Sequence, residues 1–214
     1  MSHQLPTIRI KDAWLLRWNA SIPLNELWGE GEPLRSDEEY TQIVEAYKKG
    51  WRPIEKKVLN GACETLDLDF RQGLIDVYIA PWFNAFSDPM VIGTTQEPDV
   101  FIDLLTHELI HKLLTDNTAV PDDAELFEPW QKLFGDDHTF DALVHIPVHA
   151  TLQAIYLDVL KEPRRFERDI KRSKENKSDA YTKAWDYVQE KGYKEIIDQL
   201  KSSYKELSAK YENS

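Results

Sequence analysis

The chain has 214 residues, of which 42% are hydrophobic and 11% aromatic, enough to bury a core in one domain or two small lobes. Asp and Glu number 38 against 26 Lys and Arg, giving a formal net charge of −12. This acidity argues against non-specific nucleic-acid binding, which needs basic surface to displace counterions, and against adhesion to an anionic membrane.

The N-terminus and the single cysteine indicate the compartment. Residues 1–10 lack the basic-then-apolar pattern of a secretion signal, and no apolar run approaches the roughly 20 residues that a membrane-spanning helix needs. Cys63 is alone, so an internal disulfide is impossible. We therefore expect a reducing, cytoplasmic setting and no contact with membrane.

The first third of the chain predicts a strand, a loop and two helices. Residues 7–18 mix β-branched and aromatic side chains, as strands do, and residues 21–36 are rich in Pro, Gly and Glu, as irregular loops are. A helical pattern with an acidic first turn starts at Ser36. Gly50 and Pro53 should end it before a second helix near 54–66.

Two short strands and an apolar helix follow. The strands are expected at 74–79 and 90–94, with a turn segment between them. An extended substrate could then pair with the 90–94 strand. Residues 100–114 are apolar around most of a helix, which predicts a central buried helix with Thr94 or Thr95 as its cap and Pro98 in its first turn.

Everything after Pro121 has helical spacing, with Gly135 and Gly192 as stops. The expected helices lie near 123–134, 140–160, 164–174, 179–191 and 193–211. The fold class predicted is α+β and mostly helical, with a small N-terminal sheet packed on the central helix and a C-terminal helical lobe. We expect a single domain over 1–214, its α/β lobe covering 1–118 and its helical lobe 119–214.

The central helix carries the sequence His107-Glu108-Leu109-Ile110-His111, an HExxH motif. Residues i and i+4 share one helix face, so His107 and His111 can bind one metal ion. Glu108 lies about 100° round the helix, where it can reach a metal-bound water without being a ligand. A buried carboxylate costs several kcal/mol unless a cation or hydrogen bonds compensate, and a metal supplies that cation. The alternative is a hydrogen-bonded network without metal.

A catalytic zinc has three protein ligands and an open position for water, so a third ligand must come from elsewhere. His145 and His149 are again four residues apart, with Pro147 between them. If Pro147 is in the first turn of its helix, His149 lies in the regular helix and is the predicted third ligand. His145 would then act beside the metal, as a hydrogen-bond donor to substrate. Other candidates for third ligand are His145 itself, Asp116 and Cys63.

These residues resemble a zincin-type zinc metallopeptidase, most similar to the gluzincin, thermolysin-like branch. The likeness covers about residues 70–160, with His107, Glu108 and His111 as its specific matches. It implies an α/β lobe, a motif helix at the floor of a cleft and a helical lobe that delivers the third ligand. Gluzincins supply a Glu there, whereas this chain offers His149, so the third ligand is atypical. The metzincin extension is absent, because Leu114 and Asn117 occupy its Gly and His positions.

The sequence therefore predicts a hydrolase with one Zn²⁺ that cleaves peptide amide bonds in a peptide or protein substrate. In this hypothesis His107, His111 and His149 bind the metal, Glu108 is the general base and His145 assists catalysis. The alternative is a non-catalytic zinc-binding protein that acts as a regulatory or interaction module. Four protein ligands would favour that alternative, and three with a water would favour the enzyme.

Overall fold

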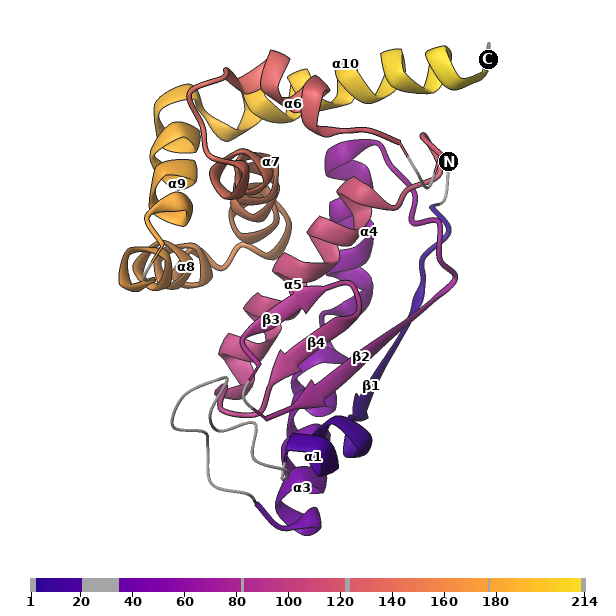
Figure 1. Cartoon of the computed structure of the whole chain (residues 1–214), viewed down its shortest axis with the longest axis vertical. Helices are drawn as coiled ribbons and strands as arrows, with labels where there is room; N and C mark the ends of the chain where they lie inside the picture. The colour runs from indigo at the N-terminus through magenta and orange to yellow at the C-terminus, as the bar shows by residue number, and fades with distance from the viewer. Residues whose placement is uncertain (1–2, 21–34, 82, 122–123, 177, 213–214) are drawn as a thin grey trace. The chain divides into compact units, whose positions relative to one another are not determined.

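The computed structural model describes residues 3–20, 35–81, 83–121, 124–176 and 178–212 (Figure 1). The chain is α+β and mostly helical, as the sequence predicted. The strands are β1 (Thr7–Asp12), β2 (Leu74–Ala80), β3 (Ala85–Ser87) and β4 (Met90–Gly93). The helices are α1 (Trp14–Ala20), α3 (Asp37–Trp51), α4 (Glu55–Leu66), α5 (Pro98–Thr115), α6 (Phe127–Phe134), α7 (Phe140–Ala154), a π-helical turn η1 (Ile155–Leu160), α8 (Pro163–Glu175), α9 (Ala180–Lys191) and α10 (Tyr193–Glu212).

The four strands form one mixed sheet in the order β1-β2-β4-β3. β1 and β2 are parallel, β2 and β4 are parallel, and β3 runs antiparallel to β4. β2 alternates in burial, with Ile75, Val77 and Ile79 turned into the core. β4 has a partner on both sides, so the expectation that a substrate pairs with the 90–94 strand is wrong. β3, which the sequence analysis took for a turn, is the edge strand beside it.

Gly93 shows how closely the end of β4 approaches the segment that precedes β3. Its N–H donates to the Asn84 carbonyl over 3.0 Å. A Cβ at this position would lie 2.1 Å from the Phe83 carbonyl oxygen, a backbone atom that cannot swing away. Only glycine therefore fits at the end of β4.

The helices before the sheet begin and end close to the predicted residues. Ser36 caps α3 in a full capping box with Glu39, which explains why the acidic first turn marks the helix start. α3 is held to the residues before α5 by the Tyr47 hydroxyl, which donates to the Gln96 carbonyl over 2.7 Å. The predicted strand over 7–18 is wrong in its second half, because α1 begins at Trp14. The predicted loop at 21–36 falls mostly outside the described residues.

The chain divides into two compact units. One contains residues 6–56 and 72–109, with the sheet, α1, α3 and the first part of α5. The other contains residues 1–5, 57–71 and 110–214, with most of α4 and the helices α6 to α10. Most of α4, which the sequence analysis put in the α/β lobe, thus belongs to the helical unit. The division cuts α5 after Leu109, inside the motif, although the helix itself is continuous through Thr115.

In the helical unit α7 is the core element, with α9 and α10 packed against it (Figure 1). From Ala142 to Ala154 nearly every residue of α7 is buried. The stretch Phe140–Leu160 is long and apolar enough to span a membrane by length and composition, contrary to the sequence expectation, but 78% of its apolar 18-residue segment is buried inside the structure. That burial is what the core helix of a globular unit shows. The predicted stops are confirmed, because Gly135 and Gly192 have φ of 100° and 87° at the ends of α6 and α9.

Candidate metal centre

The motif lies in the middle of a buried helix. α5 begins at Pro98, whose missing N–H costs nothing in a first turn. Thr94 and Thr95 lie too far before Pro98 to cap the helix, so the predicted cap is wrong. Apolar side chains such as Leu105, Leu109 and Leu113 are fully or almost fully buried on it. His107 is 5% exposed and Glu108 7% exposed. These polar groups are therefore out of water, which costs free energy unless they are matched by hydrogen bonds or a cation.

α7 begins at Phe140, as the predicted helix over 140–160 does, so the condition that Pro147 lies in a first turn is not met. Thr139 caps it by accepting from the Ala142 N–H over 3.3 Å, and the helix runs from Phe140. Pro147 is therefore inside the helix and not in its first turn. His145 and His149 are both in regular helix, one turn apart. Position in the helix therefore does not distinguish His149 from His145 as the third ligand.

The ring of His145 is held in a defined tautomer. Its Nδ1 lies 2.5 Å from the carbonyl oxygen of Asp141, one turn earlier on α7. A carbonyl oxygen only accepts, so Nδ1 carries the proton and Nε2 keeps its lone pair for a metal. A hydrogen bond of this kind orients most metal-binding histidines. The His145 ring also meets the His111 ring edge-on, with 4.9 Å between ring centroids.

His107, His111 and His145 together form a group that can hold a metal ion. One potential ligand atom from each lies within 4.8 Å of the others. His107 and His111 keep their relation through the continuous helix α5, and His145 joins them from α7. Three imidazole nitrogens suit a divalent ion of the zinc class, and three ligands leave a coordination position open.

His149 does not belong to this group among the described residues. Its ring is fully buried and stacks on Trp185 of α9, with ring centroids 4.4 Å apart and 11° between the planes. Among the described residues, the group that could hold a metal thus contains His145, which was predicted to act beside the metal, and not His149, which was predicted to bind it. Trp185 in turn donates from its indole nitrogen to Asp169 over 3.3 Å. His149 is therefore part of the packing between α7 and α9.

Burial keeps the histidines neutral. Removal from water lowers the pKa of His111 to about 3, with nearby His145 lowering it further. The same loss of hydration lowers the pKa of His145, against a smaller raising effect from its bond to Asp141. It also holds the pKa of His149 well below its usual value. A metal binds the neutral imidazole, so these ligands need not lose a proton before binding.

Other candidates from the sequence have different partners. Asp116 accepts from Arg71 over 3.0 Å and pairs with Lys112 over 3.3 Å, so it is engaged at the end of α5. Cys63 is buried on α4 and lies with a different set of residues. His138 meets Tyr187 edge-on at 5.1 Å.

Sequence reasoning missed Tyr181, at the start of α9. Its ring centroid lies 4.1 Å from that of His145 and 6.2 Å from that of His149. Tyr181 and Trp185 are four residues apart, so both lie on the face of α9 that meets the α7 histidines. That spacing was visible in the sequence, but nothing in it indicated which helix the pair would contact.

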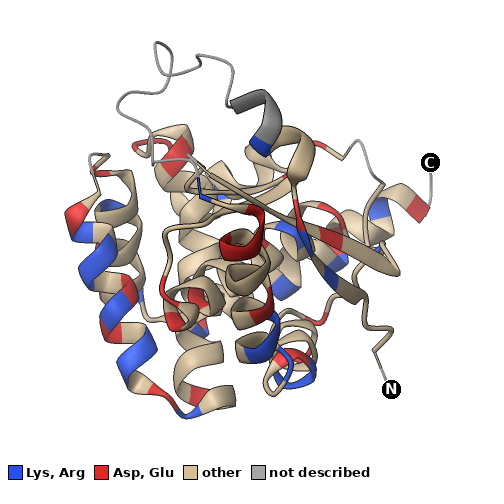
Figure 2. Cartoon of the chain, turned by 90° about the horizontal axis from the view of Figure 1, so that it is seen from below, with Lys and Arg blue, Asp and Glu red and all other residues tan. Residues whose placement is uncertain are grey.

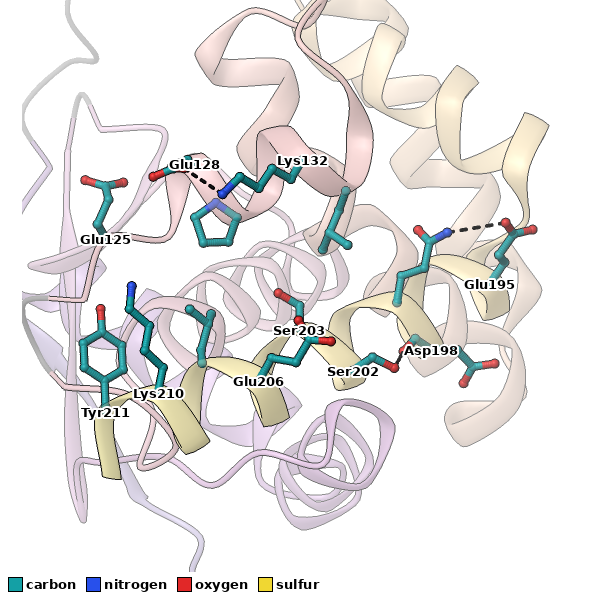
Figure 3. A pocket seen from close by; sticks show the side chains of 14 residues that line it. Glu125, Glu128, Lys132, Glu195, Asp198, Ser202, Ser203, Glu206, Lys210 and Tyr211 are labelled. Carbon is teal, nitrogen blue, oxygen red and sulfur yellow. Dashed lines mark hydrogen bonds and ion pairs between the residues drawn. The ribbon is translucent and has the colours of Figure 1, made fainter. Parts of the chain in front are cut away.

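A separate hollow of about 890 Å³ lies between α6 and α10 (Figure 3). Its wall carries acidic side chains such as Glu125, Glu206 and Asp198, together with Lys132 and Lys210. None of the histidines of the metal group is in its lining. Basic and acidic residues are interspersed over the helices (Figure 2).

Comparison with protein-family models, curated proteins and solved structures finds no significant match. The assignment of the centre therefore depends on its geometry and the chemistry of its side chains.

Proposed function

We propose that the chain is a metal-dependent hydrolase, most similar to a zinc metallopeptidase, with a metal held by His107, His111 and His145. The observation that carries the proposal is the convergence of these three imidazoles, of which those of His107 and His145 are buried, on the helix that also carries the buried Glu108. A buried hydrogen-bonded network explains one histidine on an apolar helix, whereas three histidines from two helices, with potential ligand atoms within 4.8 Å of one another, support a metal site.

When bound, such an ion polarises a carbonyl and lowers the pKa of its water to about 7. Glu108 follows His107 on the same helix, and its carboxylate accepts the proton of the attacking water. It then returns that proton to the leaving amine. The bond from His145 Nδ1 to the Asp141 carbonyl would leave Nε2 unprotonated and able to bind the metal.

Tyr181 is the candidate for a further donor, because its ring packs on that of His145. We propose that its hydroxyl stabilises the negative charge that develops on the substrate carbonyl oxygen. In the sequence hypothesis His145 had this role. Because His145 is assigned to the metal here, Tyr181 takes it over.

The alternative is a non-catalytic metal site that stabilises the fold. A structural zinc site is closed by four protein ligands. Among the residues that the structure describes, the group has three, and His149 stacks on Trp185. The count of ligands therefore supports the catalytic proposal over the structural one.

The test is Glu108→Gln, measured on protein with its bound metal quantified. The variant should keep the metal, because Glu108 is not a ligand, and lose about 10²- to 10⁴-fold in hydrolysis of a fluorogenic peptide library. Glu128→Gln is the matched control, since Glu128 is an exposed helical glutamate paired with Lys132. Full activity in Glu108→Gln would refute the mechanism, and hydrolysis by neither protein, with metal bound, would favour the non-catalytic alternative.

A further inference from the structure

A second set of metal-binding side chains lies away from the motif, within the helical unit. One potential ligand atom from each of His3, Cys63 and Asp69 lies within 4.8 Å of the others. The residues come from the N-terminal segment, from α4 and from the turn after α4. None of them is part of the proposed hydrolase centre.

The local fold explains how Asp69 returns to Cys63. α4 ends at Leu66, and Asp67 follows in the left-handed conformation with φ of 57°. The Leu68 N–H then donates to the Cys63 carbonyl over 3.2 Å, the 6→1 bond of a Schellman turn. This turn reverses the chain and brings Asp69 back beside the last turn of the helix.

Backbone bonds hold the returning segment in place. The Thr118 N–H donates to the Asp69 carbonyl over 3.0 Å, and Phe70 forms an antiparallel bridge with Asn117 at the end of α5. The Phe70 N–H donates to the Cys63 sulfur. His3 completes the set, with Nδ1 2.8 Å from the Asp69 carboxylate. The three side chains are therefore positioned by the fold before any ion binds.

We propose that His3, Cys63 and Asp69 form a second binding site for a thiophilic divalent cation such as Zn²⁺, which ties the N-terminal segment to the end of α4. Thiolate, imidazole and carboxylate are the three ligand types that zinc takes in proteins. A cation bound to one thiolate and one carboxylate forms a neutral centre. Ion entry is open from the side of His3 and Asp69, whose side chains are 18% and 40% exposed.

Binding changes the bonds at each ligand. The Cys63 S–H bond breaks and its proton goes to solvent, while a metal–sulfur bond forms. The His3–Asp69 hydrogen bond is replaced by metal bonds to the imidazole and to the carboxylate. With three ligands from this chain, a water completes a tetrahedral sphere.

A nucleophilic thiol is the competing interpretation of the same three residues, and two observations oppose it. The Cys63 side chain is fully buried, so a substrate cannot reach it. Burial, together with the nearby Asp69 charge, raises the pKa of the thiol to about 12, which leaves it protonated at neutral pH. A small cation can supply the positive charge that a thiolate needs there.

The test uses Co²⁺, because only a thiolate ligand gives a thiolate-to-cobalt charge-transfer band in the near ultraviolet. The protein carries His111→Ala and His145→Ala, so that the hydrolase centre contributes nothing. We expect the band to rise with Co²⁺ and to saturate at one ion per chain. It should disappear on adding Cys63→Ser, and it should be lost or strongly weakened on adding His3→Ala, while the matched control His138→Ala leaves it unchanged.

His3→Ala also guards against misfolding, since His3 is part-exposed in the N-terminal segment and its loss does not open the core. Circular dichroism checks the fold of each variant. Absence of the band at saturating Co²⁺, or a band that is unchanged in His3→Ala, would overturn the proposal. Either result leaves the hydrolase centre untouched, because that centre has no sulfur ligand.

Discussion

Replacing His145 tests the third ligand directly. His145 contributes a nitrogen lone pair to the group with His107 and His111, whereas His149 contributes an aromatic surface to Trp185. His145→Ala should therefore abolish tight metal binding. His149→Phe, which keeps an aromatic ring against Trp185 but has no nitrogen, should leave metal binding intact.

The magnitude follows from linkage. Loss of a residue that only orients a ligand already weakens metal affinity by about 10- to 100-fold, so loss of a ligand should cost about 100-fold or more. A Zn²⁺ concentration of 100 times the wild-type Kd stabilises the native state by about 2.7 kcal/mol. After a 100-fold loss the same concentration equals the Kd, and the stabilisation falls to about 0.4 kcal/mol. At about 2–4 °C per kcal/mol, the shift in Tm falls from about 5–11 °C to about 1 °C.

The assay is thermal unfolding with and without Zn²⁺. All proteins carry His3→Ala, so that the second centre does not contribute to the shift. Each variant is compared with its own metal-free form, which removes the stability change of the substitution itself. If Zn²⁺ still raised the Tm of His145→Ala fully but no longer raised that of His149→Phe, His145 would not be the third ligand. That result would restore the ligand set expected from the sequence, with His149 as third ligand.

Three further predictions concern the scaffold. Gly93→Ala should destabilise the chain by about 3 kcal/mol or more in urea unfolding, because its Cβ would meet the Phe83 carbonyl oxygen at 2.1 Å; a loss under about 0.5 kcal/mol would contradict this packing. Ser36→Ala should cost about 1 kcal/mol through loss of the α3 capping box, with no effect on the metal-induced shift. Arg9 and Lys11 lower the pKa of Asp76 in the folded state. The stabilisation that ionised Asp76 gives the folded state is therefore present above the unfolded pKa of about 3.9 and is lost as the pH falls through the lower folded pKa. The stability difference between wild type and Asp76→Asn should thus shrink below pH 4, and a pH-independent difference would contradict the pairing.

Much of the helical pattern could be predicted because local signals and tertiary packing agree. Ser36 with Glu39 marks the start of α3, and glycines with positive φ end α6 and α9 where their positions suggested. The failures were local conflicts. β3 has only three residues, too few to show an alternating pattern, and its pairing depends on β4. The stretch after Asp12 keeps the aromatic residues but has no β-branched ones, and it forms the short helix α1.

The first two ligands were predictable because both lie on one helix, where spacing alone fixes their relation. The third was not, because its choice depended on where α7 begins. The spacing predicted a helix over 140–160, but Pro147 is favourable in a first turn and unfavourable inside a helix, and the preference for His149 followed from placing Pro147 in a first turn. Pro147 nevertheless lies inside the helix. Thr139 caps α7 well before it, and the apolar run from Ala142 onward is almost entirely buried. Packing of that run outweighs the hydrogen bond that Pro147 removes.

The second centre was invisible for a different reason. His3 and Cys63 are about 60 residues apart in the sequence, and the end of α4 lies between Cys63 and Asp69. No motif with a fixed spacing therefore connects the three residues. A lone cysteine in an acidic chain most often serves as a small buried hydrophobe. What distinguishes Cys63 is the left-handed turn at Asp67, since only that turn returns a carboxylate to the sulfur. Asp67→Pro, which excludes the left-handed conformation, should therefore remove the cobalt–thiolate band while Asp67→Gly keeps it. Equal bands in the two variants would mean that the turn does not position the ligands.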